Sequence, residues 1–152
     1  MESIFSISNS RLSLRDLDQV LRSNINLSLS ENSRKQIVKC REYLDQKLAA
    51  SSTPIYGINT GFVSLYNKNI PKDQLEKLQE NLVKSHACGT GPEVPADIVM
   101  LMLFLKIQSL SYGYSGVQVE TVQRLIEMFN NRVWPRIYEM GSLGASGDLA
   151  PL

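Results

Sequence analysis

Apolar residues recur every three or four positions in five separate stretches, and this helical period is the strongest constraint on what the chain can fold into. A helix with one apolar stripe must bury that stripe against another element. The 152 residues are enough for one domain of ordinary size. The expected fold class is therefore mostly α.

The predicted helices begin at recognisable signals. Ser13 to Asp16 resembles a capping box at the start of the first helix, and Ser30 can cap the second. Pro71 precedes the third. Pro95 opens the fourth, which runs to about Tyr112 and is so apolar that we expect it to be buried nearly all round. The apolar positions of the fifth helix are Val119, Val122, Leu125, Ile126 and Phe129.

Between the first two predicted helices, apolar and polar residues alternate instead. Ile25, Leu27 and Leu29 are the apolar members of residues 24–30. A period of two is typical of a short strand, and an extended linker would show the same pattern. Both interpretations stay open from the sequence.

Composition excludes several classes of protein. The formal charge is +1 and no long block carries one sign, which argues against a basic nucleic-acid-binding face. The longest apolar run, Ile98 to Leu105, is far below the roughly 20 residues of a membrane-spanning helix. No secretory signal is evident, and Cys40 and Cys88 are too few for a disulfide framework. The single histidine, His86, excludes zinc sites built on several imidazoles. We expect a reduced, soluble, cytoplasmic protein without a metal.

Two glycine-rich segments interrupt the helical pattern, Tyr56–Phe62 and Gly141–Asp148. Glycine permits backbone conformations that other residues resist, so chemistry is sought first in such loops. The second segment is not a phosphate loop, since no Lys-Ser or Lys-Thr follows its last glycine. It is not a nucleophile elbow either, because Ser146 is followed directly by glycine.

A different chemistry suits the tripeptide Ala145, Ser146 and Gly147. Attack of the Gly147 nitrogen on the Ala145 carbonyl carbon would close a five-membered ring. Loss of two waters, one of them the Ser146 hydroxyl, leaves an electron-poor exocyclic alkene on an imidazolone. Asp148 could orient the turn or move protons during these steps. Small residues between glycines more often form only a tight turn, so the tripeptide alone leaves both interpretations open.

Four stretches in order resemble the aromatic amino-acid ammonia-lyases and aminomutases. They are Tyr56–Phe62, Ser85–Gly91, Ser109–Gly116 and Gly141–Leu152. The Ser85-His86 pair most resembles the histidine ammonia-lyases of this family. Family members are considerably longer, so residues 1–152 are expected to be the N-terminal portion of the lyase domain, with the remainder of the family's chain absent.

The resemblance implies a large helical-bundle lyase with glycine-rich active-site loops, and a homotetramer with shared active sites. It implies a methylidene-imidazolone formed autocatalytically from Ala145, Ser146 and Gly147, with no external cofactor. Its reaction is non-oxidative deamination of a small-molecule amino acid, which for L-histidine gives urocanate and ammonia. Tyr56 then matches the family's catalytic base, and His86 would face the ring of the substrate.

Two alternatives remain beside the histidine-specific interpretation. One is a tyrosine or phenylalanine ammonia-lyase or aminomutase of the same family. The other is a non-catalytic helical fragment, for which Val63 is the clearest sign, because the family usually has glycine there. If that glycine has a positive φ, valine would strain the loop that carries Tyr56 by about 1–3 kcal/mol. Trp134 is also bulkier than the aliphatic residue or proline expected at its position.

Overall fold

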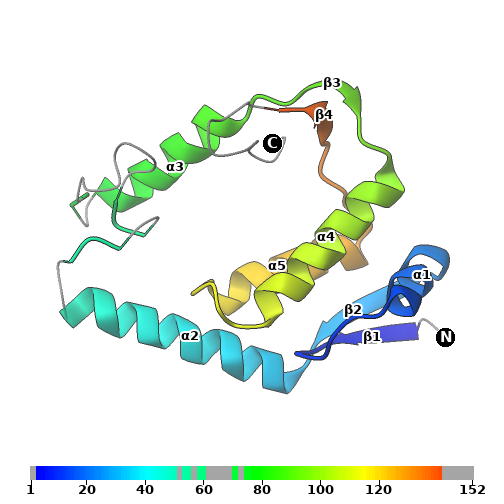
Figure 1. The fold of residues 1–152 in the computed structure, drawn as a ribbon, viewed down its shortest axis with the longest axis horizontal. Helices are drawn as coiled ribbons and strands as arrows, with labels where there is room; N and C mark the ends of the chain where they lie inside the picture. The colour runs from blue at the N-terminus through cyan, green and yellow to red at the C-terminus, as the bar shows by residue number, and fades with distance from the viewer. Residues whose placement is uncertain (1–2, 51–52, 56–57, 61–69, 72–73, 142–152) are drawn as a thin grey trace. The chain divides into compact units, whose positions relative to one another are not determined.

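The computed structural model describes residues 3–50, 53–55, 58–60, 70–71 and 74–141, and Figure 1 follows the chain through them. The chain divides into two compact units. The first comprises residues 1–47 and 94–136, and the second comprises residues 48–93 and 137–152. Helices dominate the described residues, which confirms the expected mostly α class.

Each unit combines helices with two short strands. The first contains β1 (Ser3–Ile7), α1 (Leu14–Arg22), β2 (Ile25–Leu29), most of α2 (Glu31–Ala50), α4 (Ala96–Ser111) and α5 (Val119–Asn130). The second contains α3 (Leu75–His86), β3 (Thr90–Glu93) and β4 (Tyr138–Met140). The five predicted helices are therefore all present, whereas β1, β3 and β4 were not anticipated from the sequence.

Side chains at the helix starts act as the sequence predicts. The Ser13 hydroxyl accepts a hydrogen bond from the Asp16 N–H, and the Asp16 carboxylate accepts the Ser13 N–H at 2.7 Å. This reciprocal pair is a complete capping box. At α2 the Ser30 hydroxyl accepts the Ser33 N–H at 3.2 Å. Pro95 is the N-cap of α4, as expected for a residue without an N–H to satisfy.

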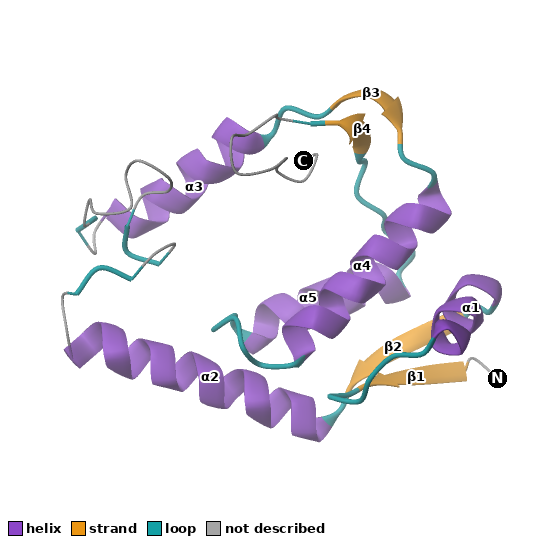
Figure 2. Ribbon diagram, viewed as in Figure 1, coloured by secondary structure: helices purple, strands orange, loops and turns teal. Residues whose placement is uncertain are grey.

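The alternating segment is a strand. β2 pairs in parallel with β1, with Ser3 opposite Ile25 and Ile7 opposite Leu29, and α1 makes the connection between them (Figure 2). The Asn130 side chain hydrogen-bonds the backbone of β2 much as a neighbouring strand would. Its Oδ1 accepts the Leu27 N–H at 2.7 Å, and its Nδ2 donates to the Leu27 carbonyl at 3.0 Å.

The core of the first unit lies where α4 and α5 pack against the two-stranded sheet. A chain of aromatic rings crosses it. Phe104, which is fully buried, lies 5.5 Å from Phe5 and 6.3 Å from Phe129 between ring centroids. Phe129 in turn meets the Trp134 ring nearly edge-on at 5.3 Å. The bulk of Trp134 is thus accommodated as a partner of this aromatic chain.

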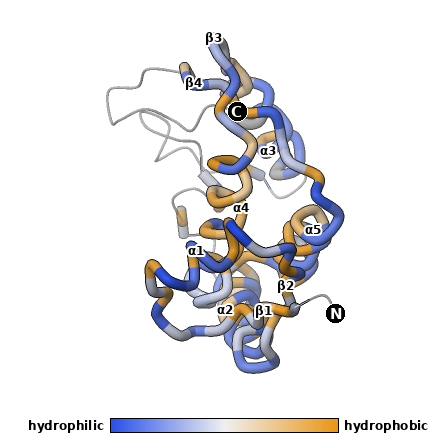
Figure 3. The backbone as a smooth tube through the Cα atoms, turned by 90° about the vertical axis from the view of Figure 1, so that its right-hand side faces the viewer, coloured by the Kyte–Doolittle hydropathy of each residue, from blue (hydrophilic) through white to orange (hydrophobic). Residues whose placement is uncertain are grey.

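The expectation that α4 is buried nearly all round is wrong for one of its faces. Ile98, Met102 and Leu105 are 45%, 39% and 45% exposed, although α4 is hydrophobic along most of its length (Figure 3). These residues are spaced by four and three positions, so they share one side of the helix. The sheet, α1 and α5 cover the other sides within the first unit.

Candidate functional site

The structure describes the surroundings of the predicted site rather than its reactive groups. Tyr56, Ala145, Ser146, Gly147 and Asp148 lie outside the described residues, and so does Val63. His86 is the last residue of α3, and its side chain is also outside the described part. The roles assigned to these residues therefore stay predictions. What the structure adds is the framework on either side of them.

Asn59 organises the loop that contains Tyr56. It is 8% exposed, and its Oδ1 accepts the Ile55 N–H at 2.6 Å while its Nδ2 donates to the Thr53 carbonyl at 3.3 Å. Its backbone carbonyl also accepts the Ile70 N–H at 2.9 Å. One buried amide therefore ties the two ends of this loop together on both sides of Tyr56. Asn59 lies inside the Tyr56–Phe62 motif, where its sequence position alone indicates no role.

A short antiparallel ladder pairs the end of the second motif with the residues directly before the fourth. β3 contains Thr90 and Gly91, which end the Ser85–Gly91 motif, and β4 ends at Met140, directly before Gly141. Thr90 lies opposite Met140. Because the strands run in opposite directions, the start of β3 and the finish of β4 lie at the same end of the ladder.

This arrangement limits how far the two motifs can separate. His86 precedes Thr90 by four residues, and Ala145 follows Met140 by five. An extended chain advances at most about 3.6 Å per residue, so each lies within roughly 18 Å of the same ladder end. This connection is not predictable from the sequence, because β3, Thr-Gly-Pro-Glu, has none of the alternating apolar residues that identify a strand.

The third motif, Ser109–Gly116, has a packing explanation. It ends α4 and forms the connection to α5, where Gly113 and Gly116 have φ of +72° and +65°. A Cβ on Gly113 would lie 2.8 Å from the Gln36 backbone, and one on Gly116 would lie 2.7 Å from the Leu44 side chain. Both glycines therefore allow this connection to pack closely on α2.

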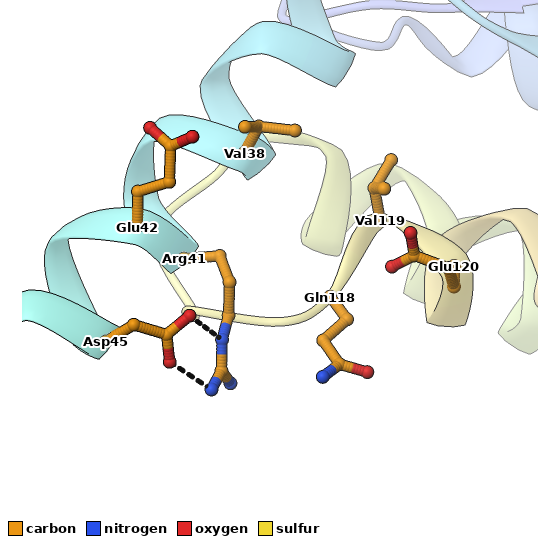
Figure 4. A pocket seen from close by; sticks show the side chains of 7 residues that line it. All are labelled: Val38, Arg41, Glu42, Asp45, Gln118, Val119 and Glu120. Carbon is orange, nitrogen blue, oxygen red and sulfur yellow. Dashed lines mark hydrogen bonds and ion pairs between the residues drawn. The ribbon is translucent and has the colours of Figure 1, made fainter. Parts of the chain in front are cut away.

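A cavity of about 420 Å³ lies beside this connection in the first unit (Figure 4). Figure 4 shows the Arg41 guanidinium engaged by the Asp45 carboxylate, and Arg41 also donates to the Gly116 carbonyl at 3.2 Å. The lining of this cavity includes none of the residues predicted for the site. The Arg41 guanidinium therefore links α2 to the segment between α4 and α5.

Perturbed carboxyl groups among the described residues have local helical causes. Hydrogen bonds from Lys77 and Lys84 lower the pKa of Glu80 on α3. The Ser13 backbone N–H, followed by its hydroxyl, lowers the pKa of Asp16.

In the part of the chain that the structure describes, no group of three or more His, Cys, Asp or Glu residues could hold a metal ion. None of the described helices has both the length and the apolar content needed to cross a membrane.

Comparison with known proteins identifies the family. Residues 12–152 match the model of the family described as aromatic amino acid lyase. The chain belongs to this family. A histidine ammonia-lyase of Legionella pneumophila is 45% identical to it over all 152 residues, which make up 30% of that relative.

Solved structures of family members have the same fold over this region. A histidine ammonia-lyase from Trypanosoma cruzi superposes with a TM-score of 0.79 at 32% identity, over 93% of this chain and 27% of that one. The phenylalanine aminomutase of Pantoea agglomerans superposes with a TM-score of 0.86 at 28% identity, over 99% of this chain and 28% of that one. The chain thus spans about 30% of the length of the lyases that it matches, and its fold is common to lyases and aminomutases.

Proposed function

We propose that the full-length protein is a histidine ammonia-lyase that converts L-histidine to urocanate and ammonia. The observation that carries this proposal is the 45% identity to a histidine ammonia-lyase across every residue of the chain. The Ser85-His86 pair supports the same choice of substrate. The protein is cytoplasmic in this proposal, and it acts as a homotetramer whose subunits share active sites.

The electrophile of this proposal comes from the chain itself. The Gly147 nitrogen bonds to the Ala145 carbonyl carbon, and that carbonyl oxygen leaves as the first water with the hydrogens of the Gly147 and Ser146 nitrogens, which makes a C=N bond to the Ser146 nitrogen. The second water takes the Ser146 hydroxyl and its Cα hydrogen. Gly147 has no Cβ to obstruct the approach of its nitrogen, and Asp148 orients the turn or moves protons. The resulting methylidene-imidazolone supplies an alkene that accepts the amine or the ring of the substrate.

Side chains remove the proton and bind the substrate in this proposal. The C3 proton of an amino acid is barely acidic and ammonia leaves poorly, so a base must meet that proton while the electrophile activates the substrate. Tyr56 is this base in our proposal. A phenol with an ordinary pKa of about 10 needs its anion stabilised to act at neutral pH. His86 binds the imidazole of the substrate as a hydrogen-bond partner or proton relay.

The substrate is tested on the full-length protein. Purified enzyme is incubated separately with L-histidine, L-tyrosine and L-phenylalanine, and the ultraviolet absorbance of each unsaturated acid is followed. We expect turnover of histidine. A tyrosine or phenylalanine aminomutase is the second candidate, because an aminomutase superposes so closely on this chain. Chromatography for β-amino acids detects that product, and turnover of tyrosine without histidine would overturn the first assignment.

The electrophile is tested by the variant Ser146→Ala. The wild-type protein should be lighter than its sequence by the mass of two waters, measured on the intact chain. Ser146→Ala has no hydroxyl to lose, so it cannot form the alkene and should lose nearly all activity. Ser10→Ala, at an exposed position in the first unit, is the matched control and should keep both the full mass deficit and the activity. Normal turnover by Ser146→Ala would contradict the proposal.

A further inference from the structure

The ladder between β3 and β4 is irregular between Thr90 and Glu93, the interval that contains Gly91. Thr90 pairs with Met140 and Glu93 pairs with Tyr138, so β3 takes three steps where β4 takes two. The extra residue makes a β-bulge, within which Gly91 has φ of +84°. Glycine in the left-handed region is the first residue of one recognised type of bulge. Bulges of this kind bend a strand and change the direction in which the chain leaves it.

The last side chain of β4, that of Met140, lies directly against Gly91. A Cβ on Gly91 would lie 2.4 Å from Met140 Cε and 3.5 Å from Met140 Cγ. Met140 is the residue directly before Gly141, where the fourth motif begins. The end of a methionine side chain can rotate away, so the positive φ is the stronger of the two constraints that favour glycine at this position.

We propose that Gly91 is a positioning residue for the formation of the electrophile. Its bulge sets the register of β4 against β3, and thereby the direction in which the chain enters the segment that holds Ala145, Ser146 and Gly147. A slip of one residue would turn every side chain of β4 to the opposite face of the ladder. Ring closure requires one backbone nitrogen to approach one carbonyl carbon, and such reactions depend steeply on how the reacting atoms are held. This inference rests on the proposed function.

The test compares glycine substitutions in the full-length protein. Gly91→Ala introduces a side chain that resists the left-handed region, whereas Gly91→Asn introduces one that tolerates it better. Gly116→Ala is the matched control, because Gly116 also has a positive φ and also faces the end of a side chain, but belongs to the first unit. Two quantities are measured on the soluble protein: the fraction that carries the two-water mass deficit, and the midpoint of thermal unfolding.

We expect Gly91→Ala to reduce the fraction with the deficit several-fold and Gly91→Asn to reduce it less. Gly116→Ala should lower the unfolding midpoint and keep the deficit of the wild type. An undiminished deficit in Gly91→Ala, or an equal loss in Gly116→Ala, would overturn the positioning role. If Gly91→Ala yields no soluble protein, Gly91→Asn decides: a reduced deficit supports the role and a full deficit overturns it. A wild type without any deficit would instead overturn the proposed function, and this inference with it.

Discussion

The two units of the molecule differ in what they bury, and the predicted site residues belong to the second unit. All the fully buried apolar side chains of the described residues belong to the first unit. In the described part of the second unit, the buried side chains are those of Asn59 and Thr60, and β3 is exposed along its whole length. Yet the second unit contains Tyr56, His86 and the tripeptide Ala145–Gly147.

Different kinds of interaction stabilise the two units. The first is stabilised by apolar burial, which is non-directional and spread over many residues. The described part of the second depends on directional contacts at a few positions, the amide of Asn59 and the bulge at Gly91. Changes in the first unit should therefore alter stability more than chemistry, and changes in the second should do the reverse.

The largest effect on stability is expected from Phe104→Ala. Phe104 is fully buried at the centre of the aromatic chain, and truncating such a residue costs about 3–5 kcal/mol. The midpoint of thermal unfolding of the full-length protein should fall sharply. The fraction of soluble protein that carries the two-water mass deficit should stay at the wild-type value.

Phe104→Leu serves as the graded control, because it leaves a smaller cavity and should lower the midpoint less. Loss of the mass deficit in soluble Phe104→Ala would contradict this difference between the units. The core of the first unit would then be needed to hold the second unit in its reactive form.

A smaller effect, of a different kind, is expected from Asn59→Ala. The substitution removes the two side-chain hydrogen bonds to the Ile55 N–H and the Thr53 carbonyl, and the loss of one such bond costs about 0.5–1.5 kcal/mol. The cost falls on the loop that carries Tyr56. We expect kcat to fall while the mass deficit remains complete, since the electrophile forms from a different segment.

Asn130→Ala is the matched control for this prediction. Asn130 also uses its side-chain amide to bond backbone on both sides, with the N–H and carbonyl of Leu27, but it lies in the first unit. Its loss should lower the unfolding midpoint and leave kcat nearly unchanged. Equal losses of kcat in the two variants would show that a general loosening of the fold, rather than the position of the Tyr56 loop, controls turnover.

Local signals made the helices predictable from sequence. Ser13 and Ser30 cap helices where their spacing predicts it, because capping involves residues only three positions apart. Strand pairing is not local. β1 can be recognised only through β2, more than twenty positions along the chain, and β3 only through β4. The exposed face of α4 was predicted wrongly because hydropathy indicates only that a helix prefers burial. It does not show whether a neighbouring element covers every side of the helix.

The candidate site was predictable only as a set of motifs. Side-chain chemistry pointed to Ala145, Ser146 and Gly147, and the resemblance added Tyr56 and His86. The residues that hold these segments carry no such chemical signal. Asn59 has an ordinary amide whose bonds reach across a loop, and Gly91 is identified as a bulge only once its partner strand is known. Supporting contacts of this kind arise from tertiary pairing, which one sequence does not display.

The smallest effect is expected from the capping box, and it depends on pH. Two hydrogen bonds from Ser13 lower the pKa of Asp16 in the folded state. A carboxyl group with a lowered pKa stabilises the fold when ionised, so its contribution is complete above the pKa of the unfolded chain and disappears as the pH falls through the folded value. Asp16→Asn should therefore lower the unfolding midpoint slightly at pH 7, and this difference should shrink as the pH falls below about 4. If wild type and variant unfold alike at every pH, the ionised carboxylate adds nothing beyond what a neutral amide supplies at this helix start.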